Sequence, residues 1–142
     1  MEQNLILKAT ATFKPRGDLG RYVEAHITPA VVASVKASVK LIENAAKAKA
    51  PVDTGALRDS ITSSVDESGK TVVGQVGPNV HYAMYVEFGT GIRGAASPGA
   101  GAGPYNPSWP GMPAQPYMRP AIDENRDAVK ELFKGEISLA LR

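Results

Sequence analysis

The stretch LGRYVEAHITPAVVASVKASVKLIENAAKAKA, residues 19–50, decides the fold of this chain. Its apolar residues recur every three or four positions, which is the spacing of one face of an α-helix. This apolar stripe consists of Ile27, Val31, Val35, Val39, Ile42 and Ala46. Pro51 follows directly, and a proline disfavours the helical conformation in the residue before it. The stretch therefore predicts one long helix that carries the core.

Two further features of this stretch concern its ends and its outer face. Thr28 followed by Pro29 suits a helix N-cap with proline at the first helical position, so we expect the helix to begin or bend there. Four lysines lie mostly off the apolar stripe, namely Lys36, Lys40, Lys47 and Lys49. We interpret them as a solvated face rather than as a phosphate-binding track, and the last two favour a helix C-terminus.

A second stretch, residues 121–141, shows the same helical spacing. Its predicted buried stripe consists of Ile122, Val129, Leu132, Phe133, Ile137 and Leu141. Three acidic residues lie near its start, where the helix dipole favours negative charge: Asp123, Glu124 and Asp127. The pattern therefore predicts a second long helix.

Shorter segments predict β-structure. Residues 4–13 alternate apolar and polar side chains, which is typical of a half-buried strand. Residues 61–65 and 71–77 are rich in β-branched side chains and flank the polar, glycine-containing connection 66–70, which predicts a hairpin. Residues 80–88 fit a short helix better than a strand. We expect one α+β domain over residues 1–142, with a small antiparallel sheet, formed by the hairpin and the N-terminal strand, packed on the two long helices.

Residues 89–116, GTGIRGAASPGAGAGPYNPSWPGMPAQP, hold half of the 14 glycines of the chain. Glycine raises the entropic cost of ordering and proline removes a hydrogen-bond donor, so regular structure is not expected here. The second half of this segment nevertheless contains large apolar side chains, and another follows directly after it. These residues are Tyr105, Trp109, Met112 and Tyr117. We predict an extended arm that docks on a neighbouring subunit or partner. The alternative is a loop whose Trp109 packs on its own core.

Composition excludes several classes of protein. The formal net charge is only +2, which is too small and too dispersed for a nucleic-acid footprint. The absence of cysteine excludes disulfides and thiolate chemistry, and it fits a reducing cytoplasm. The apolar run in residues 1–13 is too short for a signal sequence, and no run approaches 18 apolar residues. We therefore expect neither classical export nor a membrane partner.

No motif predicts catalysis, a metal site or a cofactor. His26 and His81 lack metal-ligand spacing. Asp-Thr-Gly at 53–55 is shared with aspartic proteases, but that chemistry needs two carboxylates, so we interpret it as a capped turn. Gly-Thr-Gly at 89–91 lacks the Gly-Lys-Ser/Thr of a phosphate loop. Arg-Gly-Asp at 16–18 is interpreted as a chance tripeptide in a turn.

Three sequence blocks occur in a fixed order: APVDTGALRDSI at 50–61, HYAMYVEFGTG at 81–91 and MPAQPYMRPAID at 112–123. Together they resemble the tail-completion or neck proteins of long-tailed bacteriophages, the HK-ninety-seven-type tail component family. The blocks and the adjoining helices cover most of the chain, and the N-terminal strand at 4–13 is its least typical part.

The resemblance implies a non-enzymatic structural virion protein that forms a sixfold or twelvefold ring at the head–tail junction and joins the capsid connector to the tail tube. The implied partners are further copies of the chain, head-closure or connector proteins, and the tail terminator or tail tube, with at most non-specific contact to DNA in the channel. The implied location is the neck of the virion, after assembly in the host cytoplasm. The alternative is a small binding module that acts on nucleic acid or another protein outside a virion.

Candidate interface residues follow from this interpretation. Glu87 is the acid that lies beside an aromatic cluster and a glycine turn, and we expect it to pair with Arg93 or Arg58, within or across subunits. The full candidate set is Tyr85, Glu87, Arg93, Tyr105, Trp109, Met112, Tyr117 and Arg119. An arm that orders only on binding would pay its ordering entropy at that step, which suits controlled assembly.

Overall fold

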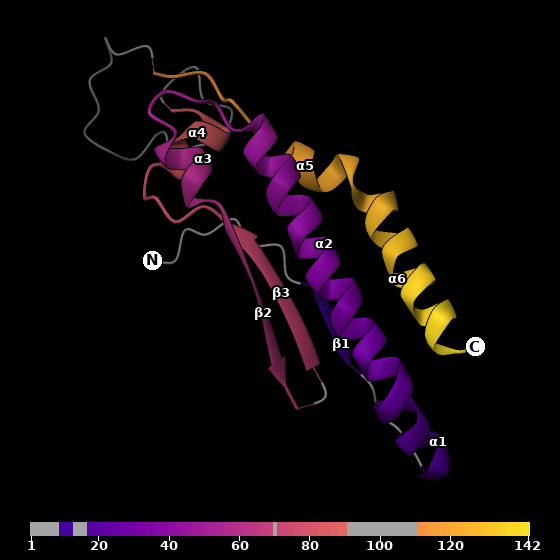
Figure 1. Cartoon of the computed structure of the whole chain (residues 1–142). Helices are drawn as coiled ribbons and strands as arrows, with labels where there is room; N and C mark the ends of the chain where they lie inside the picture. The colour runs from indigo at the N-terminus through magenta and orange to yellow at the C-terminus, as the bar shows by residue number, and fades with distance from the viewer. Residues whose placement is uncertain (1–8, 13–16, 70, 91–110) are drawn as a thin grey trace.

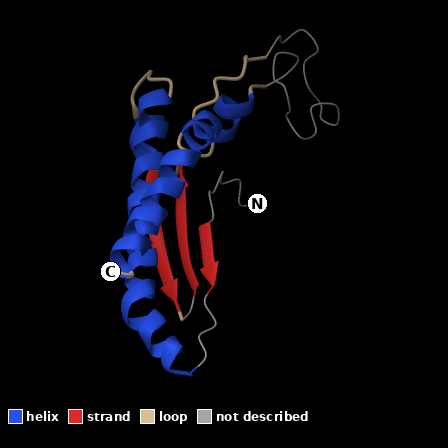
Figure 2. Cartoon of the chain, turned by 90° about the vertical axis from the view of Figure 1, so that its right-hand side faces the viewer, coloured by secondary structure: helices blue, strands red, loops and turns tan. Residues whose placement is uncertain are grey.

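The computed structural model describes residues 9–12, 17–69, 71–90 and 111–142 (Figure 1). In chain order the elements are β1 (Ala9–Thr12), α1 (Gly17–Tyr22), the π-helical turn η1 (Val23–Ile27), α2 (Thr28–Lys49), α3 (Ala56–Ser60), β2 (Thr62–Ser68), β3 (Thr71–Gly77), α4 (Ala83–Phe88), α5 (Met118–Glu124) and α6 (Arg126–Ala140). Figure 2 shows the long helices on one face of the sheet. The predicted α+β class, with a small antiparallel sheet on long helices, is confirmed.

The long helix begins earlier than Thr28, because α1, η1 and α2 run on without a break. Within η1 the Thr28 N–H donates to the Val23 carbonyl, five residues back, and the Thr28 hydroxyl lies 3.4 Å from the same oxygen. Pro29 lacks an N–H and its ring crowds the preceding turn, and a π-helical turn absorbs such an interruption. The predicted N-cap at Thr28 is therefore wrong. Of the predicted turn at 14–18, Gly17 and Asp18 belong to α1, and residues 14–16 lie outside the described part.

The core lies between α2 and the sheet. All six residues of the predicted α2 stripe are buried, as are Val72 and Val76 of β3. Gly74 lies between those valines in β3, and a Cβ added there would come within 2.5 Å of Val39 Cγ1 and 2.7 Å of Val35 Cγ1. The helix therefore approaches the sheet so closely that only glycine fits at this position.

The sheet has the strand order β1-β3-β2, and both pairs are antiparallel. The predicted hairpin is confirmed, but β2 continues to Ser68, opposite Thr71. Asp66 and Glu67 are therefore strand residues, not part of the connection. Gly69, with φ of 59°, takes the left-handed conformation after the strand ends. On the other side of β3, residues 9–12 confirm part of the predicted N-terminal strand, and residues 4–8 and 13 lie outside the described part.

A buried carboxylate ties α2 to β2. Glu43 is 4% exposed and accepts hydrogen bonds from the ammonium groups of Lys40 and Lys47 and from the Ser63 hydroxyl of β2. Burial raises the pKa of this carboxyl, but the hydrogen bonds from Lys47, Ser63 and Lys40 outweigh burial and lower its pKa from 4.5 to about 2. Two of the lysines predicted as a solvated face therefore also neutralise an acid of the core.

The C-terminal stretch forms two helices instead of one. They meet at Asn125, whose side-chain amide donates to the Ala121 carbonyl at 2.8 Å. Three residues of the predicted α6 stripe pack partly buried on the core, namely Val129, Phe133 and Ile137. No residue of α6 is fully buried, and Leu141 is 59% exposed, so its predicted burial is wrong. The stripe is therefore only half covered by α2.

By length and mean hydropathy, the helix Leu19–Lys49 is the one helix among the described residues that could cross a membrane. No uninterrupted apolar run of that length is present in the sequence. However, 44% of the apolar window is buried inside the fold, where its stripe faces β3. A core helix with many alanines and valines meets the same criterion, so we regard this segment as the core helix.

Candidate interaction site

Three short elements gather beyond the C-terminal end of α2: α3, α4 and the segment 111–117 that leads into α5 (Figure 1). The predicted short helix at 80–88 is confirmed as α4. This end of the domain also contains all three sequence blocks that carry the family resemblance, at 50–61, 81–91 and 112–123. It is therefore the candidate functional site.

Glu87 of α4 holds the start of α5. Its carboxylate is 2% exposed and accepts three backbone hydrogen bonds, from the N–H groups of Tyr117 at 2.8 Å, Met118 at 3.0 Å and Arg119 at 2.9 Å. These are the first N–H groups of α5, which have no acceptor within their own helix. A carboxylate also complements the positive end of the helix dipole. Glu87 therefore caps a helix that lies thirty residues further along the chain.

This role differs from the expected ion pair of Glu87. Arg58 instead lies 2.8 Å from Asp59, and Arg93 lies outside the described residues. The Glu87 carboxylate is used inside its own chain, so in this conformation it is not available to a second subunit. The pattern around Glu87 offers no local signal for this role, because the capped N–H groups belong to a distant segment.

Tyr117 is part of the core rather than of an exposed arm. Its side chain is 0% exposed, and its hydroxyl donates to the Ala83 carbonyl of α4 at 3.5 Å. Burial, and after it the nearby charge of Glu87, raise the pKa of the phenol well above its usual value. Tyr117 therefore packs α5 against α4, and its predicted place at a protein interface is not accessible in this conformation.

The two sides of the glycine-rich segment meet in a hydrogen-bonded pair. Thr90 N–H donates to the Met112 carbonyl at 2.9 Å, and Met112 N–H donates to the Thr90 carbonyl at 3.2 Å. One turn further on, Gln115 N–H donates to the Val86 carbonyl at 2.8 Å. The predicted arm 89–116 is thus joined to the domain at both ends. The hydrogen-bonded pair of Thr90 and Met112 forms the base of this arm. Arg93, Tyr105 and Trp109 lie outside the described residues.

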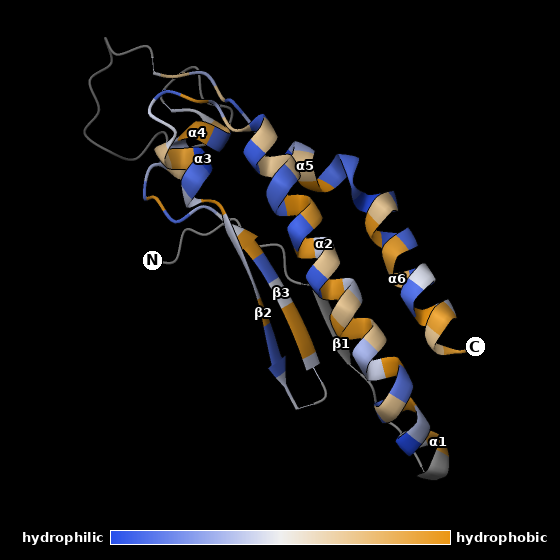
Figure 3. Cartoon of the chain, in the orientation of Figure 1, coloured by the Kyte–Doolittle hydropathy of each residue, from blue (hydrophilic) through white to orange (hydrophobic). Residues whose placement is uncertain are grey.

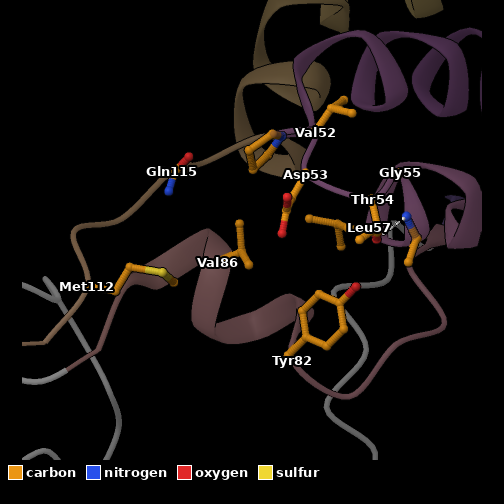
Figure 4. Close-up of a pocket in the computed structure, with 11 residues that line it drawn as sticks. Val52, Asp53, Thr54, Gly55, Leu57, Tyr82, Val86, Met112 and Gln115 are labelled. Atoms are coloured by element: carbon orange, nitrogen blue, oxygen red, sulfur yellow. Dashed lines mark hydrogen bonds between the residues drawn. The ribbon is translucent and has the colours of Figure 1, made fainter.

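A groove of about 410 Å³ opens beside this base (Figure 4). Its apolar wall is formed by Leu57, Val86 and Met112, and Figure 4 shows the Asp53 carboxylate among them. The full lining is Pro51, Val52, Asp53, Thr54, Gly55, Ala56, Leu57, Tyr82, Val86, Met112 and Gln115. The groove thus combines apolar contact area with one carboxylate.

The Asp-Thr-Gly turn at 53–55 shapes the opposite wall of the groove. Gly55 has φ of 87° and begins α3, and the Thr54 hydroxyl accepts a long hydrogen bond of 3.4 Å from Ala56 N–H. The tripeptide forms the predicted turn, but the predicted capping is wrong, because the N-cap of α3 is Gly55, which makes no side-chain hydrogen bond. Glycine is required at position 55 because other residues rarely adopt this conformation.

Two candidate interface residues lie at the surface of this end. Tyr85 of α4 is 45% exposed. Arg119 places its guanidinium 5.6 Å from the centroid of the Phe88 ring, a cation–π arrangement that joins α5 to α4. Tyr85, Met112 and Arg119 are therefore the predicted residues that this part of the structure leaves accessible or partly accessible.

The histidines and the groove carboxylate lie in separate surroundings. In the described ranges no group of three or more His, Cys, Asp or Glu side chains could hold a metal ion. His26 packs against Tyr22 at 4.5 Å between ring centroids, and His81 against Tyr82 at 5.6 Å, on different elements. The groove carries Asp53 without a neighbouring base among its lining residues.

Comparison with known proteins identifies a family for this chain. The model of the family described as "Bacteriophage HK97-gp10, putative tail-component" matches residues 17–89, from the start of α1 to the residue after α4. No curated protein and no solved structure matches the chain. The match covers more than half of the 142 residues. The chain belongs to the bacteriophage HK97-gp10 family of tail components.

Proposed function

We propose that this protein is a structural subunit of the phage head–tail junction, where copies form a ring that joins the capsid connector to the tail tube. Membership of a phage tail-component family supports a structural, non-enzymatic role in the virion. The observation that supports the ring and its joining role is the hydrogen-bonded pair of Thr90 and Met112, because it holds the two ends that flank segment 91–110 side by side.

The base gives the segment 91–110 a defined origin. Glu87 fixes α5 to α4, Gln115 N–H donates to the Val86 carbonyl of α4, and Thr90 pairs with Met112. In our proposal this segment is the arm that reaches a neighbouring subunit, with Tyr105 and Trp109 as its apolar anchors. Heterologous contacts of this kind close into a ring when the rotation between subunits is right.

The groove and the exposed Tyr85 belong to the same contact end. Because the groove combines the apolar side chains of Leu57, Val86 and Met112 with the Asp53 carboxylate, it would suit a contact that brings both an apolar side chain and a cation or hydrogen-bond donor. We expect the partners to be further copies of this chain, the connector or head-closure protein, and the tail terminator or tail tube. The expected location is the neck of the virion, reached after assembly in the host cytoplasm.

Replacement of Trp109 by Ala tests the proposal, with the neighbouring Ser108→Ala as the matched control. If Trp109 is an interface anchor, its loss weakens the contact by about 2 kcal/mol or more and leaves the unfolding temperature unchanged. The yield of joined particles, counted by electron microscopy after complementation, then falls for Trp109→Ala only. An unchanged yield with both variants contradicts an anchoring role, and a lowered unfolding temperature for Trp109→Ala indicates that it packs on its own core.

A further inference from the structure

Helices α5 and α6 are attached to the domain in different ways. Helix α5 is anchored by the Glu87 carboxylate at its start and by the ion pair of Glu124 with Lys49 at 2.6 Å, and its Ala121 is 0% exposed. No residue of α6 is fully buried. Among the described residues, the side-chain hydrogen bonds and ion pairs of α6 join it to no element except α5. Polar contacts therefore fix α5 to the domain but do not fix α6.

A half-buried apolar stripe holds α6 on the core. The stripe consists of Val129, Phe133, Ile137 and Ala140. Three ion pairs along α5 and α6 join residues three positions apart, namely Arg126 with Asp123, Lys130 with Asp127, and Lys134 with Glu131. Pairs with this spacing stabilise a helix whether or not the helix is docked. Helix α6 can therefore leave the core and stay helical. In Figure 3, apolar and polar segments alternate along α6.

Asn125 interrupts a helix that could otherwise be continuous. Its φ of -104° and ψ of 6° differ from those of a regular helix by about 40° and about 50°. Its side-chain amide donates to the Ala121 carbonyl at 2.8 Å, and its backbone N–H donates to the Ile122 carbonyl at 3.3 Å. In a continuous helix these two carbonyls would accept the backbone N–H groups of Asn125 and Arg126. The Asn125 side chain thus takes the place of a backbone donor and stabilises the bend.

The bent helix pair and a straight one satisfy different groups. In the bent form the apolar stripe is partly buried, but the first N–H groups of α6 have no acceptor within that helix. In a straight form these N–H groups would bond to carbonyls of α5, and the stripe would be exposed. Figure 1 shows that α5 points away from α2, whereas α6 turns back along α2. A straight continuation of α5 would therefore carry α6 off α2.

We propose that α5 and α6 form a two-state hinge at Asn125, in which straightening releases α6 from α2 as an intact helix while the rest of the domain keeps its fold. Helix α5 stays in place because Glu87 and its own buried residues hold it. Release changes the surface of the subunit, because it uncovers the apolar stripe of α6 and the side of α2 beneath it. This hinge depends neither on the arm nor on the ring, and it goes beyond the proposed function.

The distance between α2 and α6 tests the hinge, measured by pulsed electron paramagnetic resonance on the full-length chain. Spin labels are attached at Ala37→Cys of α2 and Ser138→Cys of α6, since both positions are exposed and the chain has no other cysteine. A second pair, Ala37→Cys with Asp66→Cys of β2, reports on the rest of the fold. Dilution with unlabelled chain excludes distances between copies. Without a substitution at the hinge, the main α2–α6 distance should be that of the bent form.

Asn125→Ala removes the side-chain donor and introduces a better helix former. The population with a longer α2–α6 distance should therefore rise about fivefold or more. Helix content, measured by circular dichroism, should stay the same or rise, and the α2–β2 distance should not change. Arg126→Ala is the matched control, because it removes the adjacent ion pair with Asp123 but keeps the Asn125 amide. This control should leave the α2–α6 distance unchanged.

Three outcomes would overturn the proposal. The first is an α2–α6 distance distribution that is the same with and without Asn125→Ala. The second is a longer distance accompanied by a loss of helix content, because α6 would then unfold instead of straightening. The third is an equal change in Arg126→Ala, which would show that the amide of Asn125 does not control the bend.

Discussion

The regions around Glu43 and Glu87 each stabilise a buried carboxylate, but with different hydrogen-bond donors. Both regions contain a buried glutamate, at 4% and 2% exposure. Glu43 is held by side chains that come largely from its own helix, Lys40 and Lys47, with Ser63 added from β2. Glu87 is held by three backbone N–H groups of a helix thirty residues away. The first network can lose one donor and keep two others, whereas the second depends wholly on one carboxylate.

The comparison shows which part of the molecule a single substitution can release. Around Glu43 the helix and the sheet are also joined by the apolar core, so the network adds to a contact that exists without it. The α4–α5 junction is also packed on the core, through Tyr117, Met118 and Ala121, but its three backbone N–H groups share Glu87 as their acceptor. The hydrogen-bond network at Glu87 is therefore the less redundant of the two, and we expect larger effects from substitutions there.

The largest effect is expected for Glu87→Ala. It leaves three N–H groups without their acceptor at a buried site, so the free energy of unfolding should fall by about 3–5 kcal/mol. Urea unfolding at neutral pH measures this loss. Glu87→Gln, which keeps the shape and one amide oxygen, should lose clearly less. Equal losses for the two variants would show that the three hydrogen bonds do not control this junction.

The second effect concerns pH and Glu43. Its pKa is lowered in the folded state from 4.5 to about 2, so its contribution is complete above pH 4.5 and disappears as the pH falls towards 2. The contribution is on the order of 3 kcal/mol. Urea unfolding at pH 7 and pH 3 should show a smaller pH dependence for Glu43→Gln than for the wild type. Identical pH dependence would mean that the lysines and Ser63 do not favour the charged form.

A third prediction uses the apolar contact between α2 and β3 as a reference. Gly74→Ala places a methyl group against Val35 and Val39, and over-packing of this kind costs about 1–3 kcal/mol. Thermal unfolding measures the loss, with Gly135→Ala as the control, because position 135 is open and alanine should stabilise its helix. Opposite signs are expected for the two alanines. A neutral Gly74→Ala would show that α2 can move away from β3 at little cost.

The smallest effect is expected for Lys47→Met. This side chain is one of three donors to Glu43 and is one-third exposed, so its loss should cost about 1 kcal/mol or less. Methionine keeps the apolar stem that covers the helix. Comparison of urea unfolding for Lys47→Met and Glu87→Ala tests the redundancy argument directly. A loss as large as that of Glu87→Ala would remove the distinction between the two regions.

Sequence patterns predicted the structure correctly where successive residues of one element face the same neighbouring element. The stripe of α2 follows the helical period because one side of the helix faces the sheet over its whole length, and the hairpin follows from two β-branched runs. The errors lie at ends and junctions. Asp66 and Glu67 pair in β2 because β3 offers a continuous edge, and Leu141 is exposed because α2 covers only part of α6.

The candidate site could be read only in part. The blocks at 81–91 and 112–123 contain both halves of the α4–α5 junction, and the resemblance that they carry led to the right family. The roles of individual residues in these blocks were not predicted correctly. Glu87 and Tyr117 have residue types that suit an interface, but the structure uses both inside the chain.

The amino-acid order by itself determined the elements whose cause is local: the period of α2, the turn at Gly55 and the hairpin, because neighbouring residues share one helix face or one strand. Tertiary structure alone decided which polar groups would meet. A carboxylate can satisfy any set of free N–H groups, so nothing local in the sequence assigns Glu87 to the start of α5. That assignment exists only once α2 and the sheet have brought α4 and α5 together and excluded water from the space between them.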